Sequence, residues 1–249
     1  MSFAKLALPL ALAAMSTSAA AALVDLSGWT AQGGSSNWAV AADKNSVFQS
    51  VNGSPTVFFS GSNDQGKALS GKIKVETTGD DDFIGFVLGY QSGNAAALAT
   101  DFILIDWKQG TQSYHGCSGA AGLAISRATA GLPDSAATWC HTGSVQELAR
   151  ATNLGSTGWL DNTEYTFDLV FTATNIQVKV NGATELNVAG NFADGSFGFY
   201  NYSQASVRYS ALEESVAPPP TGTVPEPASL ALVGLGLLAA VGAGKRRKA

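Results

Sequence analysis

Hydrophobic and polar residues alternate with period two along most of this chain, and no segment shows a sustained helical period. Such alternation predicts β-strands with one buried and one exposed face. Strands are predicted at 38–41, 47–51, 56–59, 68–77, 83–91, 102–108, 123–128, 145–151, 164–172, 176–180, 184–188, 196–202 and 206–212. Short strands separated by turns at near-regular spacing predict an all-β fold, built as a two-sheet antiparallel β-sandwich or jelly roll.

Two sequence features predict local structure, one in the segment 102–108 and one in the turn at 181–182. Phe102-Ile-Leu-Ile-Asp-Trp-Lys108 is apolar on both faces, so it should be central in its sheet. A buried Asp106 needs a partner, either Lys108 two residues on or a group on a neighbouring strand, and we interpret it as structural rather than catalytic. Asn181-Gly182 is a favoured two-residue hairpin turn, which Ala183 can widen to three residues.

The start of the chain has the pattern of a secretory signal peptide. A short basic region (1–5) precedes an apolar run (6–15) and the small residues Ser18-Ala-Ala-Ala-Ala22. This order predicts a signal peptide over residues 1–22 and a mature protein that starts near Leu23.

The other end has the pattern of a sorting signal over residues 224–249. Pro225-Glu226-Pro227 is followed by an apolar run (228–244) at the lower limit for spanning a bilayer, and then by Lys245-Arg-Arg-Lys248. Positive residues stay on the cytoplasmic side, so the preceding domain should lie outside the inner membrane. The order resembles the PEP-CTERM signal of Gram-negative bacteria, which implies transient anchoring in the inner membrane and cleavage by an exosortase-type membrane protease. An ordinary C-terminal anchor is the alternative.

Between these signals, residues 23–212 are predicted to form one domain and residues 213–223 a Pro-rich linker. The chain's net charge is −5, and Lys5 and the basic residues 245–248 lie in the targeting segments, so the domain itself is more acidic. An acidic exported domain disfavours nucleic acid, whose phosphates it repels, and suits calcium, which binds carboxylate oxygens.

The two cysteines, Cys117 and Cys140, are predicted to form a disulfide because an exported protein folds in an oxidising environment. The bond should contribute roughly 3 kcal/mol to stability. A metal–thiolate site with His115 and His141 is the less favoured alternative, since the spacing of these residues is unusual for metal ligands.

Several motifs occur in a recognisable order, at Asp80–Gln91, Phe102–Gln112, Gly122–Ile125, Trp139–Gly143, Gly158–Asp161 and Gly195–Gln204. Together with Asn37-Trp38 they resemble the lectin-like C-terminal domain of thrombospondins over about residues 36–212. The resemblance implies a curved, concanavalin-like β-sandwich that binds calcium. The sequence differs from that family in two ways. It has no Asp-rich repeats before the domain, and Cys140 interrupts the Trp-His-Thr-Gly run, so we expect the disulfide to be a feature of this protein.

The candidate calcium ligands form one main cluster, Asp80, Asp81 and Asp82. Three adjacent carboxylates repel one another, and a bound cation relieves that repulsion. A solvated turn is the alternative. Asn63, Asp64 and Asp194 are predicted to supply further oxygens. Five aromatic residues can either stack on sugar rings or pack in the core, and core packing is favoured for most of them: Trp107, Trp139, Trp159, Tyr200 and Tyr202.

These patterns favour a non-catalytic, exported module at the cell surface or in the extracellular matrix. It would bind calcium and a glycan or protein ligand, and would act in adhesion or in exopolysaccharide and biofilm association. A glycoside hydrolase or lyase on the same scaffold is an alternative, since Glu164 and Asp168 have the spacing of paired carboxylates on a strand. A structural spacer without a ligand is the third hypothesis.

Overall fold

The computed structural model describes residues 21–218. The sorting motif, the basic tail and nearly all of the predicted signal peptide lie outside this range. Within residues 21–218, no helix is long and apolar enough to cross a membrane. The predicted span at 228–244 is not among the described residues.

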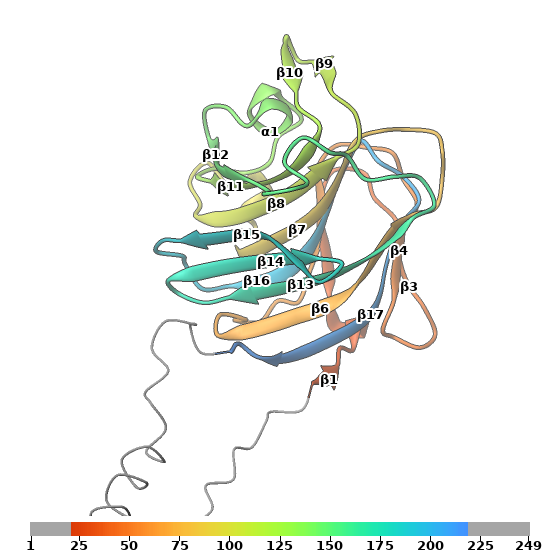
Figure 1. Ribbon diagram of the computed structural model, residues 1–249, viewed down its shortest axis with the longest axis vertical. Helices are drawn as coiled ribbons and strands as arrows, with labels where there is room; N and C mark the ends of the chain where they lie inside the picture. Colours follow the sequence, from red (N-terminus) through yellow and green to blue (C-terminus); the bar gives the residue numbers. More distant parts are fainter. Residues whose placement is uncertain (1–20, 219–249) are drawn as a thin grey trace, which may run out of the picture. The chain divides into compact units, whose positions relative to one another are not determined.

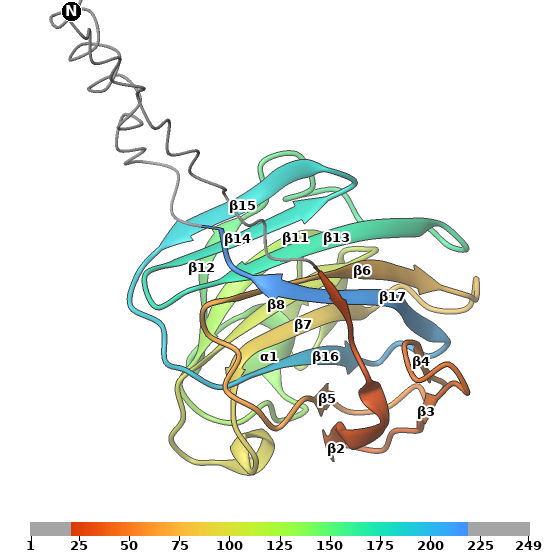
Figure 2. The same cartoon turned by 90° about the horizontal axis from the view of Figure 1, so that it is seen from below.

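The strands form two large antiparallel sheets (Figures 1 and 2). The eight-stranded sheet contains, in spatial order, β15 (Ala183–Ala189), β14 (Asn175–Val180), β13 (Glu164–Phe171), β6 (Lys67–Val75), β17 (Val207–Val216), β4 (Val47–Gln49) and β3 (Trp38–Val40), with β1 (Ala22–Leu23) paired to β17. The seven-stranded sheet contains β12 (Val145–Arg150), β11 (Gly122–Ala128), β8 (Phe102–Lys108), β7 (Phe83–Tyr90), β16 (Ser196–Tyr202), β5 (Thr56–Phe59) and β2 (Thr30–Gly33). The predicted two-sheet antiparallel sandwich is therefore confirmed.

Three short elements connect or cover these strands: the 3-10 turns η1 (Leu26–Gly28) and η2 (Asn94–Ala96), and the helix α1 (Ala136–Cys140). A two-stranded hairpin, β9 (Gln112–Tyr114) and β10 (Cys117–Gly119), projects beside α1 (Figure 1).

The main core lies between the two large sheets, where alternate residues from both sheets meet. Leu69 and Phe167 enter it from the eight-stranded sheet, and Leu88 and Ile105 enter it from the seven-stranded sheet. A second core lies on the other, outer face of the seven-stranded sheet. It contains Leu104 and Tyr200 from the strands and is closed by side chains of the connecting segments. Strand β8 is buried on both faces because each face carries a core, and it lies inside its sheet as predicted.

Every predicted strand has a counterpart, and the differences lie at edges and turns. The sequence did not reveal β1, β2, β9 and β10, whose side chains are mostly exposed and show no alternation. It also did not reveal α1, which is too short to show a helical period. The Asn181-Gly182 turn has two residues rather than three, because Val180 pairs with Ala183 and both turn residues have positive φ.

The last strand is longer than predicted. A bulge between Ser210 and Glu213, with Ala211 at a φ of 51°, interrupts the alternation. Beyond it, residues 213–216 continue the pairing of β17 with β6. Four residues assigned to the linker therefore belong to the sheet. Glu214, which looks like a solvated linker residue in the sequence, makes an ion pair of 3.0 Å with Lys67 of β6.

Candidate functional site

Three connecting segments cover the outer face of the seven-stranded sheet. They are the β7–β8 connection (91–101), the β9–β10 hairpin (112–119) and the segment between β11 and β12 (129–144), which includes α1. Leu132 and Trp139 from the last of these pack into the outer core. The covering segments create the irregular surface on which we find the candidate site.

The predicted disulfide joins two of the covering segments. Cys117 in β10 and Cys140 in α1 are bonded, and their Cα atoms lie 6.3 Å apart. Because both sulfur atoms are used, the metal–thiolate alternative is wrong. The disulfide links the hairpin to the helix across 23 positions of sequence.

Beside the disulfide, His141 forms a buried ion pair with the carboxylate of Asp106, the partner that the sequence left open. Its Nε2 lies 2.8 Å from Oδ2 of Asp106, and its Nδ1 lies 3.5 Å from Glu147. Burial alone lowers the pKa of His141, but the charge and hydrogen bond of Asp106 outweigh it and raise the pKa to about 10. The imidazole is therefore protonated at neutral pH and holds α1 against the sheet.

Lys108, the other partner considered for Asp106, instead binds Asp82. Its ammonium group is fully buried, lies 4.7 Å from the ring centre of Trp139, and donates to the backbone oxygen of Asp81 at 3.2 Å. This ammonium offsets part of the negative charge of the acidic turn.

Asp80, Asp81 and Asp82 come together as predicted, with one carboxylate oxygen from each lying within 4.8 Å of the others. Asp81 is partly exposed, and its carboxylate lies so close to Gly110 that a Cβ there would overlap Oδ2. Asp82 is buried. Burial raises the pKa of Asp82, Lys108 opposes this effect and the charge of Asp80 adds to it, and the resulting pKa is about 6. The turn therefore has an exposed side, formed by Asp80 and Asp81, and a buried side.

Asn63 and Asp64 do not join this cluster, because they precede β6 whereas the three aspartates follow it. Asp64 is 1% exposed, and its carboxylate accepts hydrogen bonds from protein donors, including Lys67 at 2.8 Å and the backbone N–H of Phe197 at 2.8 Å. Asp194 accepts from the backbone N–H of Gln65 at 3.1 Å, so it lies at the Asp64 end of the strand.

A groove of about 470 Å³ lies between the acidic turn and the β9–β10 hairpin. The polar lining includes Asn52, Ser54, Gln112, Ser113 and Ser203. Carboxylates of Asp80, Asp82 and Asp134 and the aromatic side chains of Tyr114, Trp139 and Tyr202 complete it. We call this cavity the acidic groove. Tyr114 is 48% exposed, so its ring is available to a ligand.

Asp134 is held in place by three side chains. Its Oδ1 accepts from the hydroxyl of Tyr202 and lies 2.7 Å from Nε2 of His115, and its Oδ2 accepts from Ser54 at 3.1 Å. Burial alone raises the pKa of Asp134, but its hydrogen bonds outweigh that effect and lower the pKa. The carboxylate is therefore ionised and fixed, and its side chain is still 39% exposed.

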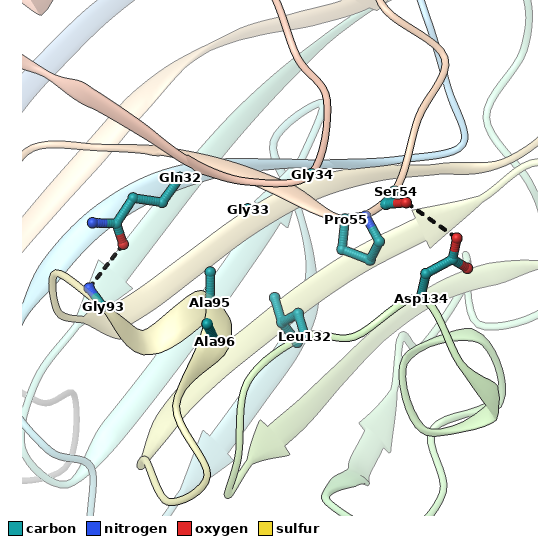
Figure 3. A pocket seen from close by; sticks show the side chains of 10 residues that line it. All are labelled: Gln32, Gly33, Gly34, Ser54, Pro55, Gly93, Ala95, Ala96, Leu132 and Asp134. Carbon is teal, nitrogen blue, oxygen red and sulfur yellow. Dashed lines mark hydrogen bonds between the residues drawn. The ribbon is translucent and has the colours of Figure 1, made fainter.

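A second cavity of about 470 Å³ adjoins the acidic groove (Figure 3). Ser54 and Asp134 line both cavities. The other walls of the second cavity are mostly small or apolar, with Gly33 and Pro55 on one side and Ala95 and Leu132 on the other. We call this cavity the glycine–alanine cleft.

The domain is similar in sequence to a known family. The sequence profile of the thrombospondin C-terminal region matches residues 34–217. The chain belongs to the thrombospondin C-terminal region family. A profile of the PEP-CTERM protein-sorting motif matches residues 223–248, which indicates an exported protein. Both resemblances predicted from the sequence are confirmed.

The relatives of this thrombospondin C-terminal domain include far longer proteins. Thrombospondin-2 of Gallus gallus is 29% identical over 197 residues, which is 71% of this chain but 16% of that protein. Thrombospondin-2 of Homo sapiens is 28% identical with the same coverage of each chain. The chain thus spans about a sixth of the length of these curated relatives.

Among solved structures, the carbohydrate-binding module CBM66 from Bacillus subtilis superposes on the thrombospondin C-terminal domain with a TM-score of 0.53. The sequence identity is 10%, and the match covers 76% of this chain and 95% of the other. At this identity the likeness shows the fold alone, a two-sheet β-sandwich.

Core packing was predicted for most of the five aromatic residues, and all five are buried in this thrombospondin C-terminal domain. Two of them, Trp139 and Tyr202, also line the acidic groove. The sequence did not reveal the groove residues Ser54 and Asp134, nor the contact of Asp134 with His115. These three residues come from three separate connections, and only the fold brings them together.

Glu164 and Asp168, considered as a catalytic pair, lie on β13 in the other sheet, at positions that point away from the main core. Glu164 makes an ion pair of 2.7 Å with Lys72. Neither residue lines the acidic groove or the glycine–alanine cleft.

Proposed function

We propose that this thrombospondin C-terminal domain is a non-catalytic module of the cell surface or extracellular matrix. It binds calcium at the Asp80–Asp82 turn and a glycan in the acidic groove. The observation that carries the proposal is the groove itself, where a partly exposed tyrosine, hydroxyl and amide side chains, and a fixed carboxylate converge beside the acidic turn. Binding sites for small molecules and sugars combine such polar groups with aromatic surface.

The residues at the turn fit calcium. Calcium binds oxygens at 2.3–2.6 Å, so two ligands of one ion lie within about 5 Å of each other, as the carboxylate oxygens here do. Asp80 and Asp81 would hold the ion on their exposed side, since the side chain of Asp81 is 40% exposed. Calcium would supply positive charge that Lys108 supplies only in part, since Lys108 is bound to Asp82.

A binding role is favoured over catalysis because the carboxyl group with a raised pKa does not reach a ligand. A glycosidase needs a protonated acid next to the scissile bond. Asp82 has the raised pKa, but its side chain is 4% exposed and bonded to Lys108. Asp134 has a lowered pKa and is unsuited to act as an acid at neutral pH.

The sorting motif supports processing by an exosortase-type membrane protease and a final place at the surface or in the matrix. Glycan binding at that place suits adhesion or association with exopolysaccharide in a biofilm. The fold shared with CBM66, which is a carbohydrate-binding module by name, supports the same class of ligand.

The calcium proposal is tested by thermal unfolding of the mature domain (residues 23–217) with calcium and with chelator. Calcium at 100 times its dissociation constant should add about 2.7 kcal/mol, which raises the melting temperature by roughly 5 to 10 °C. The double variant Asp80→Asn, Asp81→Asn should lose this shift, and the matched control Asp168→Asn should keep it. An equal shift in the double variant would place the ion elsewhere, and no shift in the natural sequence would show the turn to be merely solvated.

The glycan proposal is tested by retention on a panel of immobilised acidic, neutral and amine-bearing polysaccharides. At least one should retain the natural domain and release the Tyr114→Ala variant. Leu160→Ala is the control, since Leu160 is 62% exposed and does not line the groove. Failure of every polysaccharide to retain the folded domain would contradict the proposal.

A further inference from the structure

We propose that the acidic groove and the adjoining glycine–alanine cleft bind a linear polysaccharide that carries free amino groups, such as a deacetylated hexosamine polymer, and that Asp134 accepts its ammonium group. This inference rests on the proposed glycan-binding function and narrows it to one class of glycan.

The extent of the surface points to a chain rather than to a single sugar. The two cavities measure about 470 Å³ each and meet at Ser54 and Asp134. Figure 3 shows Ser54 hydrogen-bonded to Asp134 beside Pro55 and Leu132, where the cleft begins. An extended polymer that crosses this junction passes directly over the exposed carboxylate.

The negative charge of the surface favours a positively charged ligand. Among the described residues that line the two cavities, none is a lysine or an arginine, whereas Asp80, Asp82 and Asp134 line the acidic groove. The basic side chains that face this surface from other elements are Lys108, which is buried and bound to Asp82, and His115, which already contacts Asp134. An anionic polysaccharide would therefore be repelled by the partly exposed carboxylates of Asp80 and Asp134, and an ammonium group would gain an ion pair.

Asp134 is suited to receive that ammonium group. Tyr202, His115 and Ser54 fix its orientation, so little freedom is lost when a ligand binds. A carboxylate oxygen accepts more than one hydrogen bond, so these contacts leave acceptor capacity on the exposed side.

The remaining lining favours a sugar over a basic peptide. Asn52, Gln112 and Ser203 offer amide and hydroxyl groups that complement sugar hydroxyls. The half-exposed ring of Tyr114 offers an apolar face for a pyranose ring. A basic peptide would use the carboxylates and leave most of these groups without a partner.

The test is calorimetric titration of the purified full chain in mild detergent, with calcium present, at a pH where sugar amines are charged. The probes are β-1,4-linked hexamers of glucosamine and of N-acetylglucosamine, a hexamer of galacturonate, and hexalysine. The glucosamine hexamer should bind at least about tenfold more tightly than the other three, and added salt should weaken its binding. Asp134→Asn should weaken it about tenfold, as expected for the loss of one charge-assisted hydrogen bond, whereas the control Asp168→Asn should not.

Tyr114→Ala provides a second variant if Asp134→Asn disturbs folding, and it should weaken binding of the glucosamine hexamer to a similar degree. Equal binding of the acetylated hexamer, unchanged by Asp134→Asn, would overturn amine selectivity and leave glycan binding intact. If hexalysine binds more tightly than the glucosamine hexamer, the ligand is a basic protein segment, and the proposal of an amine-bearing polysaccharide is overturned. If none of the three sugar hexamers binds, and no immobilised polysaccharide of the panel retains the domain, the proposed glycan-binding function is contradicted as well.

Discussion

The two faces of the seven-stranded sheet are built by different means. The inner face packs against the other sheet through aliphatic and aromatic side chains such as Leu88 and Ile105. The outer face contains apolar residues too, but it also buries Asp106 and Lys108, and each finds its partner in a connecting segment. On the outer face, charge pairs fasten connecting segments to the strands, a disulfide joins two covering segments to each other, and connecting segments form the groove.

This difference between the two faces assigns most of the stability to the inner face and the candidate ligand site to the outer face. Burial of apolar surface on the inner face supplies a favourable and non-directional contribution to folding. Paired charges on the outer face contribute less to stability, because desolvation offsets their attraction, but they fix geometry. The outer face is therefore where a ligand site can be held in one arrangement, and changes there should affect binding more than global folding.

The largest effects on the free energy of unfolding are expected from two adjacent residues of β8, one on each face of the sheet. Ile105 enters the inner core and Leu104 the outer core, and both are fully buried. Truncation of either side chain should cost about 2–5 kcal/mol, with Ile105→Ala at the upper end, since the covering segments can relax around Leu104. Urea unfolding measures both values, and Leu98→Ala, at a 97% exposed position, is the control. Equal costs would contradict the distinction between the faces.

Loss of the disulfide should be the next largest effect. The variant Cys117→Ser, Cys140→Ser should lose roughly 3 kcal/mol by the chain-entropy account, because its denatured chain gains freedom. Amide exchange should become faster in residues 112–144 and change little in the strands that line the inner core. Reduction of the natural protein with dithiothreitol should reproduce the result. Faster exchange throughout both sheets would show that the disulfide supports the whole fold.

Titration of His141 should give a graded effect that is smaller per pH unit than the loss of the disulfide. Its pKa is about 10 in the folded protein and near 6.5 when unfolded, so its stabilisation is complete below pH 6.5 and is lost as the pH rises towards 10. Between these limits the free energy of unfolding should fall by up to about 1.4 kcal/mol per pH unit. Urea unfolding across this range should show a flatter profile for His141→Gln, with His115→Gln as the matched control. An unchanged profile would contradict the buried ion pair.

The smallest effect on stability is expected from Gly110→Ala. A Cβ at this position displaces the carboxylate of Asp81, which is flexible enough to move, so stability in chelator should change by about 0.5 kcal/mol or less. The stabilisation by calcium should nevertheless decrease, because one ligand is misplaced. Thermal unfolding with and without calcium separates the two quantities, and full retention of the calcium response would exclude Asp81 as a ligand.

The inner face was predictable from the sequence and most of the outer face was not. Alternation reports which residues of a strand share a face, and it correctly placed β8 inside its sheet. The Cys117–Cys140 disulfide was also predictable, because two cysteines in an exported protein are expected to pair in an oxidising environment. The contacts of Asp134 were hidden, because its partners Ser54 and Tyr202 lie 80 and 68 positions away and no local pattern joins them.

Amide hydrogen exchange with and without calcium tests most directly whether the binding surface lies on the outer face of the seven-stranded sheet. Calcium should slow exchange at residues 78–82 and in the neighbouring segment 109–116, and it should leave residues 164–171 of β13 unchanged. Slower exchange confined to the eight-stranded sheet, with no change at the acidic turn, would contradict the account.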